Sequence, residues 1–163
     1  MTSNPLIGIV VCTHNNPVLL KNALKLIESQ TYKDYAVAVV DDHSTCSDEN
    51  RRICNSFQGT IEYICNTTNG GIAWTRNEGI KHFMYSQKRP SFICMLDDDD
   101  YWPKDRLSTG LNAMEQGVGM SYGIQYMADR SLRPIVKYPC NVSYRRAIAH
   151  ALFFGEFFFP AKT

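Results

Sequence analysis

Short apolar runs of β-type residues alternate along this chain with segments whose apolar residues recur at helical spacing. The expected strands cover residues 7–12 (IGIVVC), 35–40 (YAVAVV), 61–65 (IEYIC) and 92–96 (FICML). The expected helices between them cover residues 18–30, 48–57 and 73–86. Strands that alternate with helices through short loops are typical of α/β proteins. We therefore expect a mostly parallel central sheet with helices on both faces.

The pattern is less regular after residue 100. Pro103 suits the first turn of a helix that would run to about Gln116, because proline lacks the N–H group that a first turn leaves unpaired. Residues 120–124 are a candidate fifth strand. Further on, the candidates are a strand at 134–138 and a helix at 143–153.

The chain ends in an aromatic segment, FFGEFFFPAKT, with five phenylalanines between residues 153 and 159. Two interpretations stay open. The segment is either a terminal strand packed in a core, or a surface that contacts more protein, such as a second copy of the chain or another partner.

Length and composition fit one globular domain over residues 1–163. Hydrophobic residues make up 44% and charged residues 20% of the chain, which argues against long disordered segments. The formal net charge of +1 provides no overall field to attract nucleic acid, so we expect no nucleic-acid partner. No apolar run reaches the roughly 18 residues of a transmembrane span, and the first residues do not form a secretion signal. These features predict a cytoplasmic protein, with peripheral attachment to a membrane as an open alternative.

Six cysteines are spread singly, and none belongs to a C-x-x-C pair. Three of them, Cys12, Cys65 and Cys94, fall within or at the end of expected strands. We therefore predict buried, reduced thiols in a reducing compartment rather than a disulfide framework or a zinc site.

Polar residues follow three of the expected strands: CTHNN after the first, DDHS after the second and LDDDD after the fourth. In an open parallel sheet the ligand crevice lies at the carboxyl ends of the strands. If the sheet places the first, second and fourth strands together, one cleft would contain these side chains: Thr13, Asp41, Asp42, Asp97, Asp98 and Asp99.

A cluster of carboxylates requires neutralisation, since like charges a few ångströms apart repel by roughly 1 to 4 kcal/mol per pair. Mg²⁺ or Mn²⁺ suits hard oxygen ligands, and an ion held by one or two carboxylates keeps positions open for phosphate oxygens. The acidic run therefore predicts a cation that holds a diphosphate and stabilises the charge formed when the diphosphate departs.

Each motif also has a purely structural interpretation. The two acids of DDHS can cap the following turn, NGG at residues 69–71 can form a plain turn, and the acidic run can be a solvated loop. A calcium-binding EF-hand is excluded, because such a loop needs glycine at its sixth position and the sixth residue of the acidic run is Trp102.

Taken together and in this order, the motifs resemble the family 2 glycosyltransferases, whose N-terminal half is a GT-A fold that binds a sugar nucleotide. The segments that carry the resemblance are IGIVVCTHNNPVLLKNALKLIESQTYKDYAVAVVDDHST, NGGIAWTRNEGI and FICMLDDDDYWPKDRL. The resemblance covers roughly residues 6–125. It implies a GT-A core there and the start of an acceptor-side region in residues 126–163.

For the first two loops, the resemblance implies that Thr13 lies beside the nucleotide. It also implies that Asp42 accepts a hydrogen bond from the base, with the neighbouring Asp41 in support. The NGG segment would lie near the donor, where Gly70 and Gly71 would contact the nucleotide-sugar.

The same resemblance gives LDDDD the place of the family's D-x-D motif. Asp97 and Asp99 would be its two acids, with Asp99 as the first choice for a direct metal ligand. Asp98 would lie close to the ribose or the metal, and Asp100 would be structural. Arg76 would pair either with the phosphates or with the acidic loop.

The chain departs from the family at two places. CTHN replaces the usual proline and aromatic around the first threonine, so His14 is a candidate for the aromatic's stacking position. Inverting members place a general base, an Asp or Glu often found in an E-D pair, in the C-terminal half. The later part of this chain offers only Asp129 and Glu156, and neither lies in such a pair. Trp102 is a candidate wall for the donor sugar, with core packing as the alternative.

These observations predict a metal-dependent, inverting glycosyltransferase that moves a sugar from a nucleotide-diphospho-sugar to an unidentified glycan, lipid-linked or protein acceptor. UDP-sugars are the expected donors, and the expected setting is cell-envelope or other glycan biosynthesis. Two alternatives stay open. One is a catalytically incomplete sugar-nucleotide-binding module that needs a partner or a missing C-terminal half. The other is a nucleotidyltransferase, which CTHNNP disfavours because it lacks a glycine-rich phosphate cradle.

Overall fold

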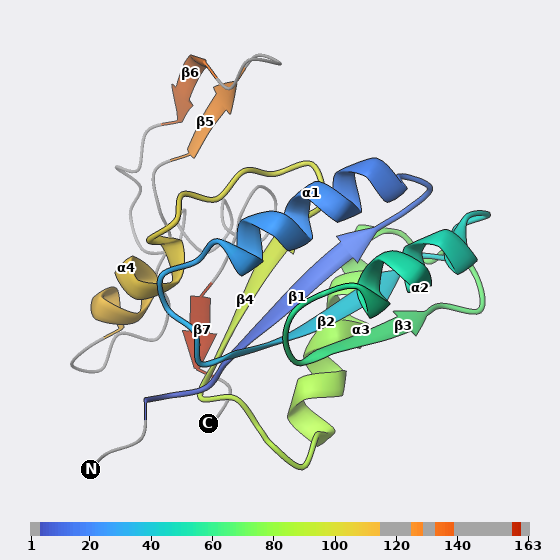
Figure 1. The fold of residues 1–163 in the computed structure, drawn as a ribbon, viewed down its shortest axis with the longest axis horizontal. Helices are drawn as coiled ribbons and strands as arrows, with labels where there is room; N and C mark the ends of the chain where they lie inside the picture. The colour runs from blue at the N-terminus through green and yellow to red at the C-terminus, as the bar shows by residue number, and fades with distance from the viewer. Residues whose placement is uncertain (1–3, 115–124, 129–132, 139–157, 161–163) are drawn as a thin grey trace.

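The computed structural model describes residues 4–114, 125–128, 133–138 and 158–160 (Figure 1). Within these residues the elements follow in this order: β1 (Ile7–Thr13), α1 (Pro17–Glu28), β2 (Tyr35–Asp41), α2 (Ser47–Asn55), β3 (Ile61–Cys65), α3 (Ile72–Tyr85), β4 (Phe92–Asp97), α4 (Arg106–Ala113), β5 (Gln125–Ala128), β6 (Pro134–Tyr138) and β7 (Phe158–Pro160). The first four strands and first three helices begin and end within two residues of the positions predicted from the sequence.

The central sheet has the strand order β3-β2-β1-β4-β7. The first four strands are parallel, and β7 joins the edge antiparallel to β4. In the register of β1, Thr13 lies opposite Asp41 of β2 and Cys12 lies opposite Asp97 of β4. The predicted mostly parallel sheet is therefore confirmed, and β1, β2 and β4 end together at one edge.

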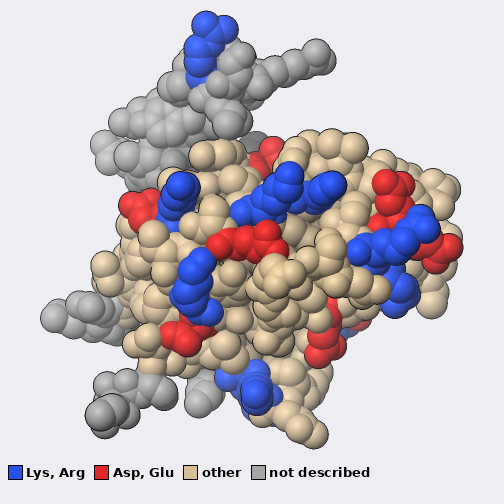
Figure 2. All heavy atoms as spheres, viewed as in Figure 1, with Lys and Arg blue, Asp and Glu red and all other residues tan. Residues whose placement is uncertain are grey.

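Both faces of the sheet are covered by helices because β1 is apolar on both sides. Ile9 and Val11 belong to the larger core, which α1, α2 and α4 close, whereas Val10 and Cys12 belong to a second core closed by α3. Figure 1 shows α1 and α2 in front of the sheet and α3 behind it. On the face shown in Figure 2, basic and acidic side chains are interspersed, in keeping with the small net charge.

The prediction that a helix begins at Pro103 is wrong, since α4 begins at Arg106. The Pro103 carbonyl accepts hydrogen bonds from the Gln30 side chain at 2.8 Å and from the Arg106 N–H at 3.1 Å. The Lys104 carbonyl accepts from the Thr31 N–H at 2.8 Å. Because these carbonyls bond the segment after α1, residues 103–105 form a turn. The predicted end of this helix, at Gln116, lies outside the described residues.

The later elements agree with the predictions in part. The strand expected at 134–138 is β6, and it pairs antiparallel with β5, which the sequence did not predict. The aromatic segment contributes β7, which pairs with Phe92–Cys94 of β4. The backbone of residues 158–160 therefore forms a terminal strand, as one of the two interpretations predicted. The candidate strand at 120–124 and the candidate helix at 143–153 lie outside the described residues.

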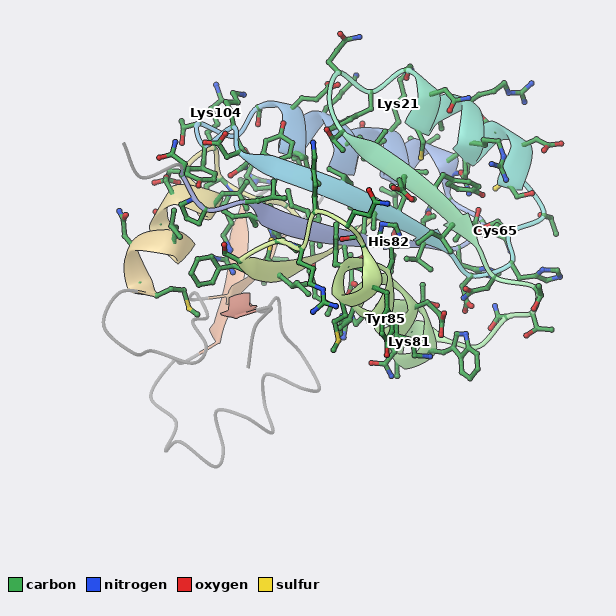
Figure 3. The ribbon with its side chains drawn as sticks, turned by 90° about the horizontal axis from the view of Figure 1, so that it is seen from below. Lys21, Cys65, Lys81, His82, Tyr85 and Lys104 are labelled. Carbon is green, nitrogen blue, oxygen red and sulfur yellow. The ribbon has the colours of Figure 1, made fainter. Side chains whose placement is uncertain are left out.

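Five of the six cysteines lie in the described residues, and all five are free. The prediction of buried thiols holds for Cys12, Cys54 and Cys94. It is wrong for Cys65, which is exposed at the end of the edge strand β3 (Figure 3), and Cys46 is only partly buried. None of the helices described is both long and apolar enough to cross a membrane.

Candidate functional site

The loops after β1, β2 and β4 meet the first turn of α3 in one cleft of about 290 Å³. Its lining residues are Cys12, Thr13, His14, Asp42, Ile72, Thr75, Asp97, Asp98 and Asp99. Five of them were predicted as site residues from the sequence, and the sheet order brings them together because β1 lies between β2 and β4. Asp41, Gly70, Gly71 and Arg76 are not among the lining residues, but each contacts a residue that lines the cleft or supports one of its loops.

Asp41 is fully buried and supports the loop after β2. Its carboxylate accepts hydrogen bonds from the Ser44 N–H at 2.8 Å, from Asn50 Nδ2 at 2.8 Å and from Tyr63 Oη at 2.5 Å. Burial alone would raise the pKa of Asp41, but these hydrogen bonds outweigh it and lower the pKa. With three partners and no exposed surface, this carboxylate organises the loop after β2. Its expected part in the nucleotide-sugar site, as the support of Asp42, stays a prediction.

Asp42 lines the cleft and organises the start of α3. Its two carboxylate oxygens accept hydrogen bonds from the N–H groups of Gly70 at 2.9 Å and Gly71 at 2.7 Å, and from Asn66 Nδ2 at 2.9 Å. Burial opposes ionisation here too, yet the same donors lower the pKa of Asp42. Gly71 has φ 79°, which glycine adopts without strain. The N–H groups of the two glycines thus orient Asp42, the residue predicted to accept a hydrogen bond from the nucleobase.

The acidic loop begins with an ion pair. Arg76 Nη2 lies 2.5 Å from Asp97 Oδ2, so Arg76 contacts the acidic loop, one of its two predicted partners. The other oxygen, Asp97 Oδ1, is buried and has no hydrogen-bond partner among the described residues. A buried carboxylate oxygen without a donor is costly, so this atom fits a cation ligand.

Asp98 is held by Thr13, whose Oγ1 donates to Asp98 Oδ2 at 2.6 Å. Burial raises the pKa of Asp98 to about 6, and the negative charges of Asp99 and Asp97 add to the rise against the opposing effect of the Thr13 hydrogen bond. A cation near these acids would relieve the repulsion.

The acid set fits a cation that also binds other ligands. Asp99 is exposed and lines the cleft beside Asp97. In the described part of the chain, no three acidic, histidine or cysteine side chains form a ready metal cluster. An ion bound here would therefore need oxygen ligands from phosphate and water, which is how Mg²⁺ is usually bound at phosphate sites.

Three further side chains belong to the strands and loops that form the cleft. His14 is exposed and lines the cleft, consistent with the candidate stacking position. Burial raises the pKa of the Cys12 thiol to about 12, so it stays protonated and is a poor metal ligand. Trp102 is only 1% exposed and packs in the larger core, so the proposed wall for a donor sugar is wrong and the packing alternative is confirmed.

Reasoning from the sequence missed part of the cleft. Ile72 and Thr75 line it from the first turn of α3, and only the position of NGG before a helix could have indicated them. Asn66, which directly follows β3, was also missed as a partner of Asp42. The two candidate general bases, Asp129 and Glu156, lie outside the described residues.

The sequence model of the family described as "Glycosyl transferase family 2" matches residues 8–162 of this chain. WcaA of Escherichia coli K12, whose name assigns it to colanic acid biosynthesis as a glycosyl transferase, is 34% identical over 117 residues, which cover 71% of this chain and 40% of WcaA. The Escherichia coli protein WfaP is named as a UDP-Glc:alpha-D-GlcNAc-diphosphoundecaprenol beta-1,3-glucosyltransferase. It is 28% identical over 142 residues, which cover 85% of this chain and 54% of WfaP.

A solved structure has the same architecture. The mannosyltransferase PcManGT from Pyrobaculum calidifontis, in complex with GDP-Man and Mn²⁺, matches with a TM-score of 0.64 and 25% identity over 73% of this chain and 35% of that chain. The parallel sheet with helices on both faces is thus the GT-A arrangement. The chain spans only 40% to 54% of the length of WcaA and WfaP.

Proposed function

We propose, from the premise that this chain belongs to glycosyl transferase family 2, that its cleft binds a nucleotide-diphospho-sugar together with Mn²⁺ or Mg²⁺ for transfer of the sugar to an acceptor. One observation carries the proposal. Thr13, Asp42 and the acids of the 97–99 loop come from three separate strands and line a single cleft. That set provides acceptors for a nucleoside at one end and carboxylates for a cation at the other.

Each residue then has a task in donor binding. Asp42, oriented by Gly70 and Gly71, would accept a hydrogen bond from the base. Thr13 and Asp98, which are already hydrogen-bonded to each other, would lie at the ribose. Their bond fixes both side chains before the donor arrives, which lowers the entropy lost on binding.

Asp99 and Asp97 would hold the cation, Asp99 from the exposed side and Asp97 through its unpartnered Oδ1. When bound, the cation neutralises the diphosphate as it leaves the anomeric carbon. Arg76 pairs with the other carboxylate oxygen, Asp97 Oδ2, and so orients this side chain. We further propose direct displacement with inversion, for which Asp129 and Glu156 stay the candidate general bases.

The relatives support a donor class and an acceptor class. The printed name of WfaP includes UDP-Glc and a diphosphoundecaprenol-linked acceptor, while the PcManGT structure contains GDP-Man and Mn²⁺. We propose a UDP-sugar as donor and a lipid-linked sugar as acceptor, in the synthesis of a cell-envelope glycan. A lipid-linked acceptor would bring the protein to a membrane surface as a peripheral protein.

Isothermal titration calorimetry with UDP and GDP, with and without Mn²⁺, tests donor binding. We expect Mn²⁺-dependent binding of UDP to the wild-type chain and at least a tenfold loss of affinity in Asp99→Asn. Asp105→Asn, an exposed acid outside the cleft, is the matched control and should bind like wild type. Absence of binding by either nucleotide, or equal affinity in Asp99→Asn, would contradict the proposal. Binding without transfer to any lipid-linked acceptor would favour the incomplete binding module.

A further inference from the structure

Asn15 lies in the loop after β1 and reaches across to the loop after β2. Its backbone has φ 53°, a left-handed conformation that asparagine adopts more readily than most residues. In this conformation its N–H donates to Ser44 Oγ at 2.8 Å. Its side-chain Oδ1 accepts from the Thr45 N–H at 2.8 Å and from Thr45 Oγ1 at 3.0 Å. Three hydrogen bonds from one residue therefore connect the two loops.

The remaining side-chain group of Asn15 acts on His14. Asn15 Nδ2 donates to His14 Nε2 at 2.9 Å, and Asn69 Nδ2 approaches the same nitrogen at 3.4 Å. Because an amide NH₂ group only donates, Nε2 must be the acceptor. The ring proton is then on Nδ1, which lies 2.9 Å from the Asp42 carbonyl oxygen and donates to it.

These contacts leave the His14 ring with one orientation. Both of its nitrogens are hydrogen-bonded along the rim, to Asn15 and Asn69 on one side and to Asp42 on the other. The ring is nevertheless exposed and lines the cleft beside the Asp42 carboxylate. A flat ring held in this way can contact a planar ligand at low entropic cost.

We propose that Asn15 is a positioning residue that holds His14, in its Nδ1–H tautomer, as a fixed wall for the nucleobase of the donor. The inference rests on the proposed function, because it requires a nucleotide in the cleft. It predicts that Asn15 contributes to nucleobase binding through His14 and does not contribute to cation or diphosphate binding at the 97–99 loop.

The test uses Asn15→Gly, since glycine keeps the left-handed backbone and removes only the side chain. We expect a 5- to 30-fold weaker affinity for UDP with Mn²⁺, whereas the affinity for inorganic pyrophosphate with Mn²⁺ changes less than twofold. In a His14→Ala background the same substitution should change UDP affinity less than twofold. Asn16→Ser, next in the chain and still able to cap α1, is the control and should bind UDP like wild type.

A spectroscopic readout separates positioning from general loop damage. Imidazole nitrogen shifts in ¹⁵N NMR should report the Nδ1–H tautomer for His14 in the wild-type chain and a shift toward the Nε2–H tautomer in Asn15→Gly. If the wild-type chain binds UDP but Asn15→Gly binds it equally well, or loses pyrophosphate in parallel, the inference is overturned while the proposed function stands. If the wild-type chain binds no nucleotide, the proposed function itself fails.

Discussion

Asp41 and Asp42 are adjacent in sequence and have different partners. Asp41 faces the interior and bonds to Asn50 of α2 and Tyr63 of β3, whereas Asp42 lines the cleft and bonds to the segment before α3. An extended backbone places successive side chains on opposite sides. Asp41 therefore supports the loop, while its neighbour Asp42 is available to a ligand. Hydrogen bonds to a charged group contribute roughly 1.5 to 3 kcal/mol each.

Asp41 makes the stability of the chain depend on pH. Its pKa in the folded state lies below the unfolded value of about 3.9. At pH values around and between these two pKa values, the unfolded state therefore binds more protons than the folded state. The stabilisation is therefore complete above pH 5 or so and is lost as pH falls through the folded pKa. We expect Asp41→Asn to lower the free energy of unfolding by about 2 to 4 kcal/mol at pH 7, with a smaller difference from wild type at pH 3.

Urea unfolding followed by circular dichroism at pH 7, 5 and 3 measures this difference. Asp34→Asn is the control, because Asp34 is exposed and its side chain bonds only to exposed Asn4 among the hydrogen bonds described. That control should change stability by less than about 0.5 kcal/mol. A loss in Asp41→Asn that stays the same at all three pH values would show that the carboxylate charge is not the cause.

At the scale of elements, α3 is unusual in what it buries. It turns Thr75, Gly79 and Phe83 toward the sheet, while Trp74 is 56% and Tyr85 80% exposed. Figure 3 shows Tyr85 and Lys81 extending from α3 away from the sheet. Because Thr75 and Gly79 are small, the helix approaches β1 closely, and this approach brings the first turn of α3 to the cleft.

At Gly79, α3 lies close to Val10 of β1. A Cβ atom added there would lie 2.3 Å from Val10 Cγ1, which no side chain tolerates without movement of the helix or strand. We expect Gly79→Ala to lower the free energy of unfolding by about 1 to 3 kcal/mol, even though alanine favours helix formation. Displacement of α3 should also weaken UDP binding, because Gly70 and Gly71 precede the same helix.

Urea unfolding of Gly79→Ala, Val10→Ala and the double variant tests this cause. If the overlap with Val10 is responsible, the double variant loses less stability than the two single variants together. Additive losses would indicate that the added methyl group acts elsewhere.

For the whole molecule, accessibility of the thiols follows from the layers. Cys54 and Cys94 are buried between helices and sheet, at 2% and 1% exposure, and burial raises the pKa of Cys54 to about 12. Cys65 lies at the end of the edge strand β3 and is exposed. Alkylation needs both access and thiolate, so the fold decides which thiols react.

We expect iodoacetamide to modify Cys65 at least about 100-fold faster than Cys54 in the native chain, since reaction at Cys54 requires opening of the core. Peptide mass spectrometry over a time course measures both rates in one sample. In 8 M urea the two rates should become similar, which serves as the internal control. Equal rates under native conditions would mean that α2 does not protect Cys54.

Local sequence patterns were sufficient to predict most of the strands and helices that form the core. Strands at 7–12, 35–40, 61–65 and 92–96 could be predicted because apolar runs and helical periodicity are properties of neighbouring residues. The convergence of Thr13, Asp42 and Asp97 was predicted on the condition that the sheet places the first, second and fourth strands together, since parallel strands end at a common edge. The strand order of the folded sheet meets that condition.

The choice of partners depended on the tertiary structure. Arg76 pairs with Asp97, Asp42 bonds to Gly70 and Gly71, and Gln30 contacts Pro103 so that α4 begins later than predicted. Trp102 likewise packs in the larger core, against residues that are distant from it in the chain. Each of these contacts joins residues far apart in the chain, and its free energy depends on distances that exist only after the layers have packed. The sequence therefore determined that Thr13, Asp42 and the acids of residues 97–99 stand at strand ends. Packing brought Ile72 and Thr75 to the same cleft and decided which residues support it and which remain available to a ligand.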